Sequence, residues 1–308
     1  MKDQKQYTFS QNPLTVIKNI IKYIFFRTAT TKSNNLYVRG SDRLSIAPQI
    51  EGLHEAAVSN YIKFSATQNN KSDFLIDIGA NIGLISCQTG NDFKKVICYE
   101  PNPLCCHILK VNTAISLNKL NVKIYEFGLG TQDEDLELWI PKKNWGGAFI
   151  RSRDNFYSDD ILAKKDGFIN LDKKNYIIEN VKVCNGSNNL SELFKDLSSN
   201  NLINGVIKID VEGMEQSILE SISKALPKNI NVDIIFENWD DNLDFISIKN
   251  YFKNRKIVIK ELKNIIPYKK TWPKVFKGIA MILSGNFTSL EEIDFNKSTV
   301  GDIIINIE

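Results

Sequence analysis

The segment that most constrains this chain is FLIDIGANIG, at residues 74–83. A short apolar run ends at Asp77, and Gly79, Ala80 and Gly83 follow within the next six residues. Such a run is typical of a strand buried on both faces, and the small residues predict a tight turn into a helix. In open parallel sheets, ligands bind beyond the carboxyl ends of the strands, where the strand order reverses. The segment therefore predicts a buried parallel sheet with a ligand site at its edge.

Strands and helices alternate along the chain from residue 73 onward. We expect strands at 73–78, 95–100, 122–128, 205–210 and 232–237, and helices at 82–89, 103–117, 213–225 and 243–253. This alternation predicts an α/β fold in which helices cover a mostly parallel sheet. An antiparallel pair at 256–262 and 277–283 is expected to close the sheet, and residues 302–308 to add an edge strand.

The order of elements divides the chain into three parts. We expect an N-terminal helical extension at 1–70, a main domain at 71–285 and a C-terminal tail at 286–308. An insertion at about 129–204 is far longer than an ordinary connection, which favours a lid or substrate platform. Residues 13–27 have the apolar spacing of an amphipathic helix, too short to span a bilayer. Docking on the domain, on a sister subunit in an oligomer or on a membrane surface all fit this helix.

Charge and cysteine content exclude few classes of protein. The net charge of +3 does not by itself imply a polyanionic partner. The five cysteines include no C-x-x-C pair, so neither a disulfide framework nor a zinc site is indicated. The N-terminus has no signal-peptide pattern, and a reducing cytosol is the simplest compartment.

The residues around the glycine turn indicate the kind of ligand. Asp77 places a carboxylate where a pyrophosphate would be repelled, so a cationic or zwitterionic ligand is favoured over a dinucleotide. Glu100 ends the next strand, 21 residues after Gly79, where a carboxylate can accept hydrogen bonds from a ribose diol. Together these features predict a pocket for S-adenosylmethionine. A ligand-free structural loop and a nicotinamide site are the alternatives.

Four motifs in this order, LIDIGANIG, YEPNP, NWGG and IKIDVEGMEQSIL, resemble the FkbM-type S-adenosylmethionine-dependent methyltransferases over residues 51–283. The resemblance implies a Rossmann-like class I methyltransferase fold with a seven-stranded sheet and helices on both faces. It also implies O-methylation, often of a sugar hydroxyl. One departure is NGSNNL at 185–190, where many relatives carry Thr-Leu-Asp. The candidate cofactor-binding residues are Asp77, Gly79, Ala80, Asn81, Gly83, Glu100, Pro101, Asn102 and Gly128.

Three carboxylates at the ends of later strands are the candidate catalytic residues. Asp210 and Glu212 follow the fourth strand, and Glu237 ends the fifth. A hydroxyl acceptor needs its proton removed, and clustering raises the pKa of at least one acid towards neutrality. We favour Asp210 or Glu212 as a metal-free general base over a Mg²⁺ site formed by the three acids. A third interpretation is that Asp210 and Glu212 only cap the following helix.

The turn Asn144–Trp145–Gly146–Gly147 is the candidate substrate element. Asn144 can hydrogen-bond to sugar hydroxyls and Trp145 offers an apolar ring face, although a plain hairpin turn accounts for the same residues. His54 and His107 are interpreted as structural, because two isolated histidines lack the spacing of a metal site.

A basic stretch suggests the partners. Residues 249–277 contain ten Lys or Arg and one acid, Glu261. They form either a solvent-exposed face with no partner or a surface that attracts an anionic acceptor, such as a lipid-linked saccharide at the inner membrane. Nucleic acid is not favoured, because no aromatic-rich strand pattern occurs.

The sequence thus predicts an S-adenosylmethionine-dependent enzyme that is cytoplasmic, either cytosolic or peripheral at the inner membrane. The resemblance implies that it is an O-methyltransferase that methylates a sugar hydroxyl in bacterial surface polysaccharide or glycolipid synthesis. The alternatives are a methyltransferase for a non-sugar hydroxyl of a secondary metabolite and a cofactor-binding, non-catalytic partner of a glycosyltransferase.

Overall fold

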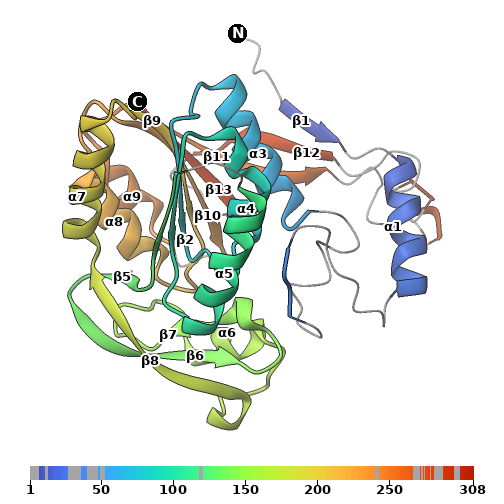
Figure 1. Ribbon diagram of the computed structural model, residues 1–308. Coiled ribbons are helices and arrows are strands. Elements are labelled where there is room, and N and C mark those ends of the chain that lie inside the picture. Colours follow the sequence, from blue (N-terminus) through green and yellow to red (C-terminus); the bar gives the residue numbers. More distant parts are fainter. Residues whose placement is uncertain are drawn as a thin grey trace.

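The computed structural model describes most of the chain, and the description below is confined to that part. The described residues are 7–10, 13–26, 36–39, 48, 53–117, 121–239, 243–265, 271, 273, 275–277, 279–280, 287–294 and 299–308. They form a large central sheet with helices on both faces and a small second sheet below it (Figure 1).

Five parallel strands make the centre of the large sheet. Their order is β10 (Asn231–Asn238), β9 (Asn204–Ile209), β2 (Phe74–Ile78), β3 (Lys95–Tyr99) and β4 (Asn121–Tyr125). The strand order reverses between β2 and β9, because the chain builds outward from β2 to β4 before it returns on the other side. Both strands end at this switch point, which is where the sequence predicted a ligand site.

The C-terminal side of the sheet differs from the sequence prediction. The strand predicted for the sheet edge, β13 (Gly301–Ile307), lies inside the sheet, antiparallel to both β10 and β11 (Ile257–Ile265). Its signal was the run Ile303, Ile304 and Ile305, all fully buried, since a strand covered on both faces is apolar at consecutive positions.

The partner predicted for β11 was also wrong. Lys277, Ile279 and Ala280 of the predicted strand 277–283 are helical, and residues 281–283 lie outside the described part of the chain. Instead, β11 pairs with β12 (Phe287–Glu292), and β12 pairs with β1 (Tyr7–Ser10). The described sheet therefore has nine strands rather than seven, while the predicted α/β class with a mostly parallel centre is confirmed.

Alternate residues of the central strands face two helical layers. Ile76, Ile207 and Ile234 belong to the core under α7 (Gly186–Ser199), α8 (Glu215–Ala225) and α9 (Phe245–Tyr251). Leu75, Val206 and Ile235 belong to the core under α3 (Ala56–Gln68), α4 (Leu84–Thr89) and α5 (Pro103–Ser116). Burial of both faces accounts for the continuous apolar runs in these strands.

A second sheet fills most of the predicted insertion. Its strand order is β5 (Gly128–Gly130), β8 (Tyr176–Asn185), β6 (Glu134–Pro141) and β7 (Phe149–Ile150). The helix α6 (Asp159–Lys165) follows β7, and short 3-10 turns lie at Gly90–Asp92, Trp145–Gly147 and Lys173–Asn175. Although α7 falls within the predicted range 129–204, it packs on the central sheet through Leu190 and Phe194. The domain bounds at 70 and 285 stay predictions.

The predicted amphipathic helix at 13–27 is confirmed as α1 (Pro13–Phe26). It lies beyond β1 and β12, at the outer edge of the molecule (Figure 1). Within the described ranges, none of the helices combines the length and apolar character that a membrane span requires.

Candidate active site

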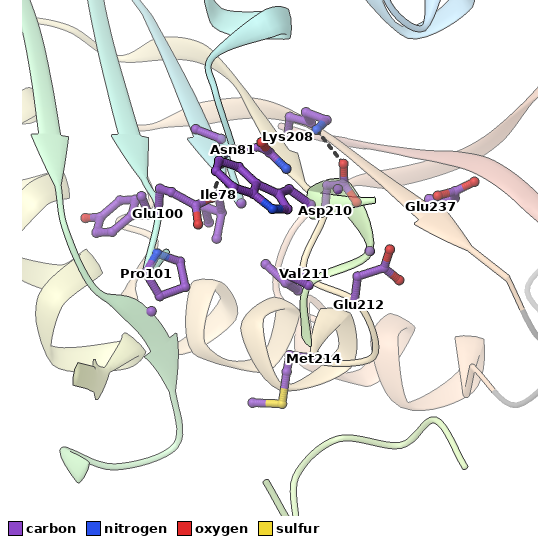
Figure 2. Close-up of a pocket in the computed structure, with 18 of the residues that line it drawn as sticks. Ile78, Asn81, Glu100, Pro101, Lys208, Asp210, Val211, Glu212, Met214 and Glu237 are labelled. Atoms are coloured by element: carbon purple, nitrogen blue, oxygen red, sulfur yellow. Dashed lines mark hydrogen bonds and ion pairs between the residues drawn. The ribbon is translucent and has the colours of Figure 1, made fainter. Parts of the chain in front are cut away.

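One cavity of about 380 Å³ lies at the carboxyl ends of the central strands. It is lined by the turn after β2, the end of β3, the turn after β9, the end of β10 and parts of the second sheet. Of the sequence-predicted residues, it brings together Gly79, Ala80, Asn81, Glu100, Pro101, Gly128, Asn144, Trp145, Gly146, Gly147, Asp210, Glu212 and Glu237. Figure 2 shows Asn81, Glu100 and Pro101 on one side of the cavity and the three candidate acids on the other.

The two glycines of the turn are required by the protein's own packing. Gly79 has φ +81°, and a Cβ atom there would stand 1.8 Å from the carbonyl oxygen of Asp210. Gly83 has φ +84°, and its Cβ would stand 2.5 Å from Cδ1 of Leu109. Any side chain at Gly79 would therefore separate the ends of β2 and β9, the two strands that form the switch point.

Three predicted cofactor residues do not line the cavity, namely Asp77, Gly83 and Asn102. Asp77 is completely buried and accepts a hydrogen bond of 2.6 Å from the Ser86 hydroxyl. Its Oδ1 atom lies 3.9 Å from Nζ of Lys208. Burial raises the pKa of Asp77. The carboxylate thus supports the strand end from beneath and lies outside the cavity wall where contact with the ligand was predicted.

Glu100 is held in place by backbone amides. Its Oε2 accepts from the amide of Asn81 and its Oε1 from the amide of Asn102, each at 2.7 Å. Only 6% of the residue is exposed, and this burial raises the pKa of Glu100 to about 7. A carboxylate oxygen has two acceptor sites, so each oxygen retains one for a ligand hydroxyl. Asn102 acts indirectly, since its side chain also caps α5 by accepting from the amide of Leu104.

Asp210 is paired with a buried lysine that sequence reasoning missed. Nζ of Lys208 lies 2.9 Å from Oδ2 of Asp210, a contact drawn as a dashed line in Figure 2. Burial lowers the pKa of Lys208, but the Asp210 and Asp77 carboxylates outweigh it and raise the pKa well above its usual range. A lysine inside the otherwise apolar strand GVIKID was the available signal, because such a lysine needs a buried acid.

Glu212 is also paired with a lysine, this one from the insertion. Nζ of Lys165, in α6, forms an ion pair with Oε2 of Glu212, and both side chains are about nine-tenths buried. The same ammonium lies 4.5 Å from the ring centroid of Trp239 and 5.3 Å from that of Tyr157. Burial raises the pKa of Glu212 to about 8, against the opposing effect of Lys165. These contacts join α6 to the turn after β9.

The turn after β9 does not serve as a helix cap. At the start of α8, the amide of Gly213 donates to the Glu215 side chain at 3.0 Å, and no side chain caps the helix at Met214. The interpretation of Asp210 and Glu212 as simple capping acids was therefore wrong. Glu212 has φ +49°, and Asn155 of the insertion donates to its carbonyl oxygen at 2.9 Å.

Glu237 differs from the other two candidate acids. It ends β10 and lines the cavity, and its side chain accepts a hydrogen bond from Trp239. Burial, and then the charge of Asp210, raise the pKa of Glu237. Across the described ranges, Lys, Arg and His residues form ion pairs with Asp210 and Glu212 but not with Glu237.

The three carboxylates do not form a shared metal site in the described part of the chain. No three His, Cys, Asp or Glu side chains there are grouped closely enough to hold a metal ion. Two of the three acids instead face lysine ammonium groups. The donor arrangement therefore does not favour the Mg²⁺ alternative.

The turn at residues 144–147 joins β6 to β7, which agrees with the hairpin interpretation, and it also lines the cavity; its contact with a substrate stays a prediction. The Nδ2 atom of Asn144 donates to Oδ1 of Asp166 at 3.1 Å, and a Cβ at Gly147 would meet the same oxygen at 2.3 Å. The guanidinium of Arg39 lies 4.4 Å from the ring centroid of Trp145. Asn144 and Trp145 thus line the cavity from a turn held by contacts with Asp166 and Arg39.

The two histidines have different surroundings. His107 is an exposed residue of α5. His54 lies just before α3 and lines the cavity together with Glu55, with 3.1 Å between its Nε2 and Oε1 of Glu55. His54 is thus part of the cavity wall, and no local pattern in the sequence places residues before α3 over the strand ends; its structural role stays a prediction.

Comparisons with known proteins identify the family of this chain. The family described as the methyltransferase FkbM domain matches residues 77–262, more than half of the chain. A relative, methyltransferase sdnD from Sordaria araneosa, is 24% identical over 174 residues, which cover 54% of this chain and 66% of that protein. The match thus spans just under two thirds of that relative.

Solved structures of low sequence identity are also similar. One is the O-methyltransferase from Bacillus cereus in complex with SAH, with 8% identity, coverage of 96% of this chain and 100% of that chain, and a TM-score of 0.41. Another is precorrin-6y C5,15-methyltransferase from Geobacter metallireducens GS-15, with 12% identity, coverage of 83% and 93%, and a TM-score of 0.36.

The cavity also fits the cofactor that the family match implies. Its volume of about 380 Å³ lies within the range of small-molecule sites. Glu100 offers the fixed acceptors that a ribose diol requires, and two further carboxyl groups, those of Asp210 and Glu237, line the same cavity. The chain belongs to the FkbM methyltransferase domain family, and its cofactor is S-adenosylmethionine.

Proposed function

We propose that this protein is an O-methyltransferase that transfers the methyl group to a sugar hydroxyl, in the synthesis of a bacterial surface polysaccharide or glycolipid. One observation carries the proposal. The cavity lined by Glu100 is also lined by two indole rings, those of Trp145 and Trp239, and by the carboxylate of Glu237. Aromatic faces and hydrogen-bonding carboxylates are the groups that suit a polyhydroxylated ring.

Glu237 is the general base of this proposal. S-adenosylmethionine, when bound, supplies a methyl group activated by its sulfonium. A sugar hydroxyl keeps its proton at neutral pH, so the proton must leave during the attack. Asp210 and Glu212 already face Lys208 and Lys165, whereas Glu237 accepts from Trp239 and forms no ion pair with a Lys, Arg or His residue that the structure describes. Its raised pKa brings it nearer to neutrality, where a general base is most effective.

The two ion-paired acids have positioning roles in this scheme. Asp210 and Lys208 fix the end of β9 against the glycine turn, where the amide of Asp210 donates to the carbonyl oxygen of Ile78 at 2.9 Å. Glu212 and Lys165 hold α6 against the cavity beside Trp239. Both pairs keep the reacting groups in a fixed geometry, which is the main requirement of a methyl displacement.

A second candidate is methylation of a non-sugar hydroxyl on a secondary metabolite. The observation that favours it is the apolar part of the same wall, formed by Leu138, Ile150 and Met214. A largely apolar acceptor would bury its carbon skeleton there and present its hydroxyl to Glu237. The two candidates share the base and differ only in the acceptor.

The test is incubation with labelled cofactor and two acceptor sets, saccharides and apolar alcohols, with mass detection of methylated products. The variant Glu237→Gln keeps the shape of the side chain and removes the base. We expect its turnover to fall about 10²- to 10⁴-fold while its affinity for the cofactor changes only a few fold. Glu179→Gln, at an exposed position of β8, is the matched control and should keep full turnover.

Each result is decisive for a different part of the proposal. Methylation of apolar alcohols alone selects the second candidate, and no methylation of either set favours the non-catalytic alternative. Full activity of Glu237→Gln removes Glu237 from the mechanism. Wild-type activity should survive a metal chelator, and its loss would replace the metal-free base with metal-assisted chemistry.

A further inference from the structure

The helix α1 presents its apolar side to the outside. Leu14, Ile17 and Ile21 lie on one stripe of the helix, and their exposed fractions are 72%, 36% and 51%, respectively. The positions turned inward, Pro13, Val16 and Asn19, are only partly covered and less apolar. A helix docked on its own domain has the opposite arrangement, with the apolar stripe buried. The exposed stripe therefore indicates contact with something outside the described chain.

A second exposed apolar group lies near the other end of the chain. Val275, Phe276 and Ile279 have a helical backbone conformation, and their exposed fractions are 71%, 59% and 46%, respectively. Together with Leu14, Ile17, Ile20 and Ile21 they are called the apolar surface below. Contiguous apolar exposure of this kind marks interaction sites on otherwise water-facing proteins.

Strand pairing ties the two groups to the same end of the sheet. β1 and β12 are antiparallel, and Ser10, the last residue of β1, is paired with Phe287, the first residue of β12. α1 begins at Pro13, three residues after Ser10, and Ala280 precedes Phe287 by seven residues. Figure 1 shows α1 beyond this end of β1 and β12. Both apolar groups thus belong to one region of the molecule.

All charged residues in the sequence of these two regions are basic. Residues 13–27 and 265–283 contain seven Lys or Arg and no Asp or Glu. They also contain six aromatic residues, namely Tyr23, Phe25, Phe26, Tyr268, Trp272 and Phe276. Apolar residues combined with Lys and with aromatic rings are typical of segments that lie in the interface of a membrane.

We propose that the apolar surface docks this protein on an anionic lipid bilayer. The lysines in the sequence of residues 13–27 and 265–283 match the charge of anionic lipids, because each Lys near a membrane adds to the attraction. A second copy of the chain is the other candidate occupant, but a symmetric contact would bring two exclusively basic regions together without acids to neutralise them. The proposal is independent of the acceptor assigned to the cavity.

The experiment is flotation of the full chain with vesicles of phosphatidylcholine alone or mixed with phosphatidylglycerol. We expect binding to the mixed vesicles only, weakening as salt is raised. The double variant Ile17→Glu/Ile21→Glu should lower the partition coefficient about tenfold or more, and Phe276→Glu should lower it independently. Ile169→Glu is the matched control, because Ile169 is 90% exposed but lies in the insertion. It should bind like the wild type.

All these positions are exposed, so the variants should keep the melting temperature and the cofactor affinity of the wild type. Absence of vesicle binding, or equal loss in Ile169→Glu, would overturn the proposal. So would light scattering that shows a dimer separated by the Ile17→Glu/Ile21→Glu changes, since the surface would then be an interface between copies. Because cofactor affinity is measured in parallel, failure here is distinct from failure of the proposed methyl transfer.

Discussion

The two ends of the cavity are built in different ways. At the cofactor end, Glu100 is fixed by amides of Asn81 and Asn102, which are 19 and 2 residues away in the chain. At the end proposed to bind the acceptor, called the acceptor end below, Glu212 is fixed by Lys165, 47 residues away and on a helix of the insertion. The position of Glu100 depends on backbone geometry at adjacent strand ends. The position of Glu212 depends on long side chains that meet across the fold. Substitutions at the first end should therefore mainly lower the stability of the fold. Substitutions at the second end should mainly disturb the balance of charge.

The largest expected effect is that of Gly79→Ala at the cofactor end. The new Cβ would stand 1.8 Å from the Asp210 carbonyl oxygen, at a residue with φ +81°. Backbone must move, so we expect a loss of about 3–5 kcal/mol in the free energy of unfolding. Urea unfolding followed by circular dichroism measures it.

The matched control is Gly167→Ala in the insertion. Gly167 has a similar φ of +78° but no atom within 4 Å of the added Cβ. It isolates the backbone strain, which should cost about 1 kcal/mol. Equal losses in the two variants would show that the strand contact at Gly79 adds nothing, and the contrast between the two ends would then be unfounded.

A smaller effect is expected from Lys165→Met at the acceptor end. With Lys165 present, burial already raises the pKa of Glu212 to about 8, above its unfolded value, so folding favours the protonated acid below pH 8. Without the ammonium the pKa rises further, and the cost appears where the wild-type carboxylate is ionised. We expect a loss of about 2 kcal/mol at pH 9 and less than about 1 kcal/mol at pH 6.

The double variant Lys165→Met/Glu212→Gln tests the cause of that loss. It removes the carboxyl group whose protonation causes the pH dependence, so its stability relative to the wild type should vary less between pH 6 and pH 9. Lys174→Met, at an exposed position of the same insertion, should behave like the wild type. A loss in Lys165→Met that is the same at both pH values would assign the effect to packing against Trp239 rather than to Glu212.

This contrast also explains what the sequence could predict. The glycine turn, Glu100 and the parallel strands were predictable, because apolar runs and turn residues act over short distances in the chain. The pairing of Glu212 with Lys165 was not, since nothing local distinguishes Lys165 from Lys164 in α6. Lys208 is an intermediate case. A lysine in a buried strand indicates that it has an acidic partner, but the sequence does not identify which residue that partner is.

The position of β13 was missed for a related reason. The run Ile303–Ile305 indicates burial on both faces, yet the order in which strands pair depends on contacts across the whole sheet. Three residues of the predicted strand 277–283 are helical, so its apolar content misled the assignment. Short apolar runs fit a buried strand and an exposed docking segment equally well.

The smallest expected effect concerns the protonation of Glu100. Burial raises its pKa to about 7, whereas a diol hydroxyl donates best to the ionised carboxylate. The free protein therefore holds a proton on Glu100 below pH 7, and binding must release it. Adenosine is the suitable probe, because it carries the diol but no group that titrates between pH 6 and 8. We expect its Kd to be about tenfold weaker at pH 6 than at pH 8.

The variant Glu100→Gln should bind adenosine weakly at both pH values and remove the pH dependence, while Glu126→Gln, at an exposed residue, should retain it. Calorimetry in buffers of different ionisation enthalpy would also detect the released proton near pH 6. An unchanged Kd between pH 6 and 8 in the wild type would mean that Glu100 does not hold the diol or stays ionised despite its burial. Buffer-dependent calorimetry of the wild type separates these two cases. If Glu100 stays ionised, the amides of Asn81 and Asn102 stabilise the charge more than burial opposes it, and the cofactor end is then set by electrostatics as much as the proposed acceptor end.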